Sequence, residues 1–77
     1  MINLLLFANF QEVIGSKALS LELNVNNILE LKNYLLSKYP ELDFNFVMVA
    51  VNEEYATDET VIKSGDVVAF IPPVSGG

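Results

Sequence analysis

The chain has 77 residues, ten carboxylates against four lysines and a formal net charge of −6, a size that suits one small domain. The negative charge argues against a nucleic-acid partner, because phosphates would be repelled, and favours encounter with a basic protein surface. The sequence contains neither cysteine nor histidine, so thiolate or imidazole metal sites and imidazole-activated nucleophiles are excluded, and we expect no enzyme activity from this chain alone.

The chain begins with an almost unbroken apolar run, residues 2–8, which predicts a strand covered on both faces. This run is too short for a membrane span and has neither a basic flank nor a small-residue cleavage site, so we expect a cytoplasmic protein without a membrane partner. After a polar stretch with a break at Gly15 and Ser16, residues 17–24 alternate with leucines on one side. We expect them to form a half-buried hairpin partner of the first strand.

Helical spacing begins at Asn27, whose side chain can cap a helix while Glu30, three residues later, reaches back as in a capping box. The apolar residues that follow lie on one stripe: Ile28, Leu31, Leu35 and Tyr39. Leu29 and Leu36 widen this stripe on one side. Lys32 falls inside the widened stripe, so we expect its stem to cover apolar surface and its ammonium to reach water. Pro40 limits continuation of the helix. The sequence therefore predicts one main amphipathic helix packed across one face of the sheet.

The second half of the chain has the composition of strands and turns. Residues 44–51 predict a strand, residues 52–54 a turn, and the region near Tyr55 a short edge strand. A second turn at residues 63–66, where Gly65 can adopt a positive φ, leads to another continuous apolar run at residues 67–71. The two apolar runs most economically lie side by side in the middle of one mixed sheet. This order of elements predicts an α+β fold of the β-grasp, or ubiquitin-like, type.

The end of the chain has an unusual composition. Residues 1–71 predict the β-grasp domain, and residues 72–77 an extended, flexible tail. Pro72 and Pro73 fix φ and lack an N–H, so they stop strand pairing. The chain then closes with Val74, Ser75, Gly76 and Gly77. Because glycine has no Cβ, such an end could enter a passage too narrow for other residues and present its carboxylate to a partner. This pattern predicts a functional carboxyl terminus.

Several short blocks carry a family resemblance, and the last is the most diagnostic: Leu6-Phe7-Ala8 with Glu12 and Gly15, Asn27 at the helix start, Val49-Ala50-Val51-Asn52, Gly65-Asp66-Val67-Val68-Ala69-Phe70, and Pro72-Pro73-Val74-Ser75-Gly76-Gly77. On these blocks the whole chain resembles the small, sulfur-carrying subunit of molybdopterin synthase, a ubiquitin-like family. It departs from the family pattern at Gln11, where an arginine is common, and at Ile71, where a second aromatic residue is common.

The resemblance implies chemistry at Gly77, with Gly76 beside it. A ubiquitin-activating-like adenylyltransferase would use ATP to convert the terminal carboxylate into an acyl adenylate, and a sulfur donor protein would turn it into a thiocarboxylate. The thiocarboxylate would enter the large subunit of molybdopterin synthase and give sulfur to the cyclic pyranopterin precursor, which forms the dithiolene of the molybdenum cofactor. This chain would bind no cofactor itself. The absence of cysteine agrees with such a role, because the protein cannot carry a persulfide.

The resemblance also implies a set of residues that contact the partner: Phe7, Tyr55, Phe70, Ile71, Pro72, Pro73, Val74 and Ser75. Of these, Phe7 and Ile71 could equally be core residues. Three other functions stay open on the sequence: a sulfur carrier for thiamine or another pathway, a ubiquitin-like modifier joined through Gly77 to lysines of target proteins, and an interaction module whose tail is inert.

Overall fold

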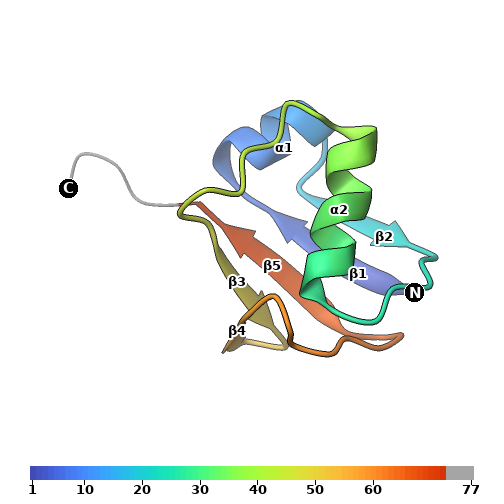
Figure 1. Cartoon of the computed structure of the whole chain (residues 1–77). Helices are drawn as coiled ribbons and strands as arrows, with labels where there is room; N and C mark the ends of the chain where they lie inside the picture. Colours follow the sequence, from blue (N-terminus) through green and yellow to red (C-terminus); the bar gives the residue numbers. More distant parts are fainter. Residues whose placement is uncertain (73–77) are drawn as a thin grey trace.

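The computed structural model describes residues 1–72, and it contains one mixed sheet of five strands in the order β2-β1-β5-β3-β4 (Figure 1). The strands are β1 (Ile2–Leu6), β2 (Ala18–Leu21), β3 (Met48–Val51), β4 (Glu54–Ala56) and β5 (Val67–Ile71). β1 and β5 pair in parallel, and the other neighbours pair antiparallel. The β-grasp prediction is confirmed, and the two apolar runs lie side by side as expected.

Two helices, α1 (Ala8–Ile14) and α2 (Ile28–Lys38), accompany the sheet, and both contribute to the same core (Figure 1). The strands supply alternate residues to this core, and the helices supply Phe10 from α1 and three residues from α2: Ile28, Leu31 and Leu35. Within residues 1–72, neither helix is long and apolar enough to cross a membrane.

The short helix α1 lies between the first two strands and was not predicted, whereas α2 is the one main helix that the sequence predicted. Helix α1 has seven residues, no side-chain cap at Phe7, and a single fully buried residue, Phe10. It ends at Gly15, which adopts a left-handed φ of 85°, a common way to stop a helix. β1 and β2 still pair antiparallel, with Leu4 opposite Leu19.

The capping of α2 follows the sequence closely. The Asn27 side chain accepts a hydrogen bond of 2.9 Å from the Glu30 N–H, as predicted. The Glu30 carboxylate reaches back, but it accepts from the N–H of Asn26, at 3.0 Å, one residue earlier than in a standard capping box. The helix ends at Lys38, before Pro40. The bond from the Glu30 N–H satisfies one of the amide donors that the first turn of a helix leaves free.

Two further expectations are corrected by the packing around Phe44. The predicted strand at residues 44–51 is shorter, because Phe44 leaves the sheet and Val47 N–H donates back to the Phe44 carbonyl at 3.2 Å. The Phe44 ring instead meets Phe10 edge to face, with ring centroids 5.2 Å apart. Lys32 lies over this ring at 5.8 Å, and its ammonium forms an ion pair of 2.7 Å with Asp58 rather than only meeting water.

Candidate partner interface at the end of strand β5

Strand β5 is anchored up to its last residue. It lies between β1 and β3, with Phe70 opposite Leu6 on one side and opposite Val49 on the other. Ile71 is opposite Met48, and Pro72, the last residue that the structure describes, is partly buried. Strand β5 therefore ends at Ile71, where the sequence predicts the boundary of the domain. The predicted tail residues Pro73, Val74, Ser75, Gly76 and Gly77 lie outside the described residues.

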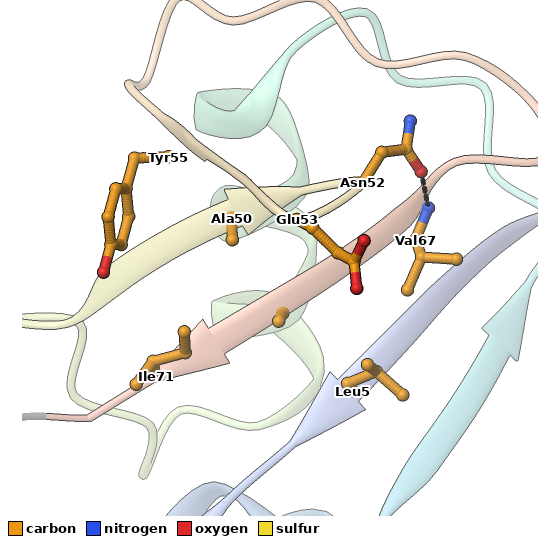
Figure 2. Close-up of a pocket in the computed structure, with 8 residues that line it drawn as sticks. Leu5, Ala50, Asn52, Glu53, Tyr55, Val67 and Ile71 are labelled. Atoms are coloured by element: carbon orange, nitrogen blue, oxygen red, sulfur yellow. Dashed lines mark hydrogen bonds between the residues drawn. The ribbon is translucent and has the colours of Figure 1, made fainter.

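The face of the sheet opposite the helices carries a shallow apolar hollow (Figure 2). Side chains from four strands line it, namely Leu5 of β1, Ala50 of β3, Tyr55 of β4 and Val67, Ala69 and Ile71 of β5. The small side chains of Ala50 and Ala69 lie opposite each other in the β3–β5 ladder, which makes the floor low. The hollow has a volume of about 600 Å³. Such an uncovered apolar face is a candidate surface for a protein partner.

Three of the predicted partner-contact residues are accessible on or beside this face. Tyr55 is 76% exposed, Phe7 46% and Ile71 37%. Phe7 has an extended backbone and follows the buried Leu6, so it continues the alternation of β1 on the side of Leu5. The structure therefore places Phe7 and Ile71 at the surface rather than in the core, and both lie at the end of the sheet where β5 finishes.

Phe70 is different, and its prediction as a contact residue is corrected. Its side chain is completely buried, because alternation along β5 directs it toward the helices. Its ring lies 5.9 Å from Phe10 and 5.4 Å from Phe44, measured between centroids. Phe70 thus belongs to an aromatic cluster in the core, and its side chain cannot reach a partner while the core is intact.

A polar network fixes the other end of β5. The Asn52 side chain accepts a hydrogen bond from Val67 N–H at 3.0 Å (Figure 2) and donates one to the Asp66 carboxylate at 3.0 Å. The Lys63 N–H also donates to Asp66, at 2.9 Å. These bonds, from Asn52 first and then from the Lys63 backbone, lower the pKa of Asp66 below its ordinary value. The network joins the turn before β5 to the turn after β3.

Sequence reasoning missed two apolar residues at the tail end of the sheet. Met48, opposite Ile71, is 49% exposed, and Phe46 is 88% exposed. Phe46 and Pro72 help to line a second shallow hollow of about 390 Å³, together with Ala8, Asn9, Asp43, Asn45 and Val47. Residues 44–51 have the composition of a strand, so nothing in the sequence marked Phe46 as a turn residue.

A five-stranded β-grasp sheet whose central strand leads directly into the carboxyl-terminal segment defines a ubiquitin-like protein. The model of the ThiS family matches residues 4–77, and the chain belongs to this family. It is 37% identical to the molybdopterin synthase sulfur carrier subunit of Arabidopsis thaliana over 99% of this chain and 82% of that protein. It is 35% identical to the subunit of the same name from Haemophilus influenzae over the full length of both.

Solved structures agree with the fold. The small archaeal modifier protein 1 from Methanosarcina acetivorans superposes with a TM-score of 0.81, at 25% identity over 99% of this chain and 95% of that one. One chain in the complex of subunits 1 and 2 of the molybdopterin-converting factor from Helicobacter pylori matches with a TM-score of 0.70, at 23% identity over 99% of this chain and 97% of that one. These structures support the fold, and the curated relatives show the similarity to sulfur carrier subunits of molybdopterin synthase.

Proposed function

We propose that this chain carries sulfur on the carboxyl terminus of Gly77 and delivers it within molybdopterin synthase. The observation that supports this most strongly is the full-length match to sulfur carrier subunits combined with the position of β5. The central strand of the sheet leads straight into Pro72 and the five residues that end in Gly77. The partner would thus bind the folded domain, and the reaction would take place at the terminus.

The terminal carboxylate must first be activated, because a carboxylate is a poor electrophile. An adenylyltransferase partner would use ATP to form an acyl adenylate at Gly77 and release pyrophosphate. A sulfur donor protein would then supply sulfur at the oxidation level of sulfide, which displaces AMP and leaves a thiocarboxylate. The thiocarboxylate sulfur would attack a carbon of the cyclic pyranopterin precursor and displace an oxygen substituent from it. Water would then cleave the resulting thioester, which leaves the sulfur on the precursor and restores the carboxylate. Two such transfers would complete the dithiolene.

The partner surface would combine the helix-free face of the sheet with the end of β5. Phe7, Tyr55 and Ile71 supply exposed apolar area there, and Pro72 leads from this surface toward the terminus. The complex of subunits 1 and 2 from Helicobacter pylori supports a large subunit as the partner. The net charge of −6 favours a basic surface on that partner, because complementary charge speeds encounter. We expect this assembly in the cytoplasm.

Intact-mass spectrometry tests the proposed chemistry. The protein is incubated with its adenylyltransferase, ATP and the sulfur donor, and we expect the mass increase that corresponds to replacement of one oxygen by sulfur at Gly77. A variant that lacks Gly77 is the matched control, and it should keep the fold but gain no sulfur. If the full chain stays an unmodified carboxylate where a known carrier reacts, the proposal is wrong.

A second candidate is a protein modifier, because the chain is similar to the small archaeal modifier protein 1. In that role the activated Gly77 would form isopeptide bonds with lysines of target proteins. Immunoblots of cell extract separate the two functions. Ladders that disappear when Gly77 is deleted would support conjugation, whereas a sulfur carrier alone predicts only the free chain and its non-covalent complex.

A further inference from the structure

Phe46 combines two features that are unfavourable for a free protein. Its side chain is 88% exposed, the largest exposed fraction among the large hydrophobic residues of the described range 1–72. Its backbone adopts a φ of 63°, in the left-handed region that is costly for a bulky residue. It is the third residue of the turn from Phe44 to Val47, where a positive φ usually selects glycine or asparagine. Outliers of this kind cluster at functional sites.

The neighbours of Phe46 are fixed, so the outward position of its ring is imposed by the fold. Val47 N–H bonds to the Phe44 carbonyl at 3.2 Å, and Asn45 N–H bonds to the Asp43 carboxylate at 2.9 Å. On one side the Phe44 ring is held in the aromatic cluster, and on the other Met48 starts β3 opposite Ile71. The core therefore gains no packing from Phe46, although it determines where that residue lies.

The position of Phe46 beside Pro72 indicates which protein would contact its side chain. Phe46 and Pro72 line the same hollow, and five residues separate Pro72 from the end of the chain. Even fully extended, those five residues reach at most about 18 Å. Any protein that acts on the Gly77 carboxylate must therefore bring its surface within this distance of Pro72. A side chain beside Pro72 is consequently well placed to touch such a protein.

We propose that Phe46 is an anchor residue that inserts into an apolar pocket of the large subunit, next to the cleft that receives the carboxyl terminus. The proposal rests on the proposed function, because it takes the large subunit as the partner. Aromatic side chains in desolvated pockets dominate the energy of many interfaces. Asp43 lies in the same hollow and no lysine lines it, so a pocket with a basic border fits this surface.

The test uses the substitution Phe46→Gly, with Phe46→Asn as a second variant, because both residues tolerate a positive φ. Binding of the large subunit to the full-length chain is measured by isothermal titration calorimetry, and the melting temperature by circular dichroism. We expect Kd to rise about tenfold or more, as for loss of a hot-spot residue. The melting temperature should stay the same or rise, since the strain is relieved and little buried surface is lost.

Leu29→Ala is the matched control, because Leu29 is 47% exposed but lies on α2, away from the end of β5. It should leave Kd unchanged. If Phe46→Gly binds as tightly as the wild type, the inference is wrong while the proposed function stands. If sedimentation shows that Phe46 instead holds two copies of this chain together, with Kd for the large subunit unchanged, it is also wrong. A wild-type chain that does not bind the large subunit at all refutes the proposed function itself.

Discussion

Phe70 and Ile71 are adjacent in β5 but face opposite sides of the sheet, so their substitutions should affect different properties: Phe70→Ala mainly the stability of the fold, and Ile71→Ala mainly the binding of the partner. Phe70 is fully buried among aromatic rings, whereas Ile71 is 37% exposed at the rim of the apolar hollow. Removing a buried phenylalanine side chain typically costs about 3–5 kcal/mol. A domain of this length has a total free energy of unfolding of about 4–12 kcal/mol, at about 0.05–0.15 kcal/mol per residue. Phe70→Ala should therefore remove at least about a quarter of the free energy of unfolding.

Ile71→Ala should cost less, because part of its side chain already contacts water. We expect a loss of about 1–2 kcal/mol, below the range of fully buried isoleucines, together with weaker binding of the large subunit. The assay is urea unfolding followed by circular dichroism, paired with calorimetric binding. Phe70→Leu keeps most of the apolar volume and serves as a folded control that should bind normally.

The outcome that contradicts this reasoning is specific. If Phe70→Ala folds with wild-type stability but fails to bind, then Phe70 is a contact residue and its placement in the core is wrong. If Ile71→Ala is as destabilising as Phe70→Ala, the helix-free face is not an open surface. Either result would require a different account of which side of β5 meets the partner.

Three further predictions concern other parts of the chain. The folded chain lowers the pKa of Asp66, so the ionised carboxylate stabilises the fold at pH above the unfolded pKa of 3.8, and this stabilisation is lost as the pH falls through the lower pKa of the folded state. The melting temperature of the wild type should therefore fall in acid, and Asp66→Asn should flatten that fall. Asn27→Ala removes the cap of α2 and should cost about 1 kcal/mol in urea unfolding, and Asn27→Ser should recover most of it. Tyr55→Ala should leave the melting temperature unchanged, because the side chain is 76% exposed, but should weaken binding of the large subunit about tenfold; unchanged binding would remove β4 from the proposed interface.

The parts of the fold that the sequence predicted are those decided by local chemistry. The cap at Asn27 and the stop before Pro40 bound α2 almost to the residue. The continuous apolar runs correctly predicted β1 and β5 as neighbours inside the sheet. The prediction that the first strand is covered on both faces is wrong, because helices cover only one face of β1 and Leu5 is 39% exposed on the other. Gly65 adopts the positive φ expected of its turn, at 95°.

The parts that were missed depend on contacts between distant residues or on strain. Helix α1 has one fully buried side chain and no side-chain cap at its amino end, so its sequence shows too little periodicity to be distinguished from a loop. Lys32 pairs with Asp58, which lies 26 residues further along the chain, and no local pattern predicts this pair. Phe46 occupies a position with a positive φ that sequence rules assign to glycine, so composition favoured a strand there.

The candidate interface was predicted only in part, because a sequence shows which residues are apolar but not which side of a strand they face. Phe7, Tyr55 and Ile71 were identified through the family resemblance, and the structure shows that all three are accessible. The same resemblance included Phe70, which alternation along β5 turns into the core. The register of β5 with β1 and β3, which decides between the two sides, depends on pairing across the whole chain.

The two ends of β5 differ in the side chains around them: polar groups that bond to one another surround its start, and exposed apolar side chains surround its finish. This difference favours the finish of the strand for binding a partner. At the start of the strand, the Asn52 side chain donates to Asp66, and both side chains accept from backbone N–H groups, so that end is stabilised internally. At the finish, apolar side chains remain in water: Phe7, Phe46, Met48 and Ile71. Covering them gains free energy only when a partner is present, and a partner that binds only the folded chain stabilises it by mass action. A domain this small can therefore leave apolar surface uncovered beside its terminus, and the partner that receives Gly77 would supply the missing burial.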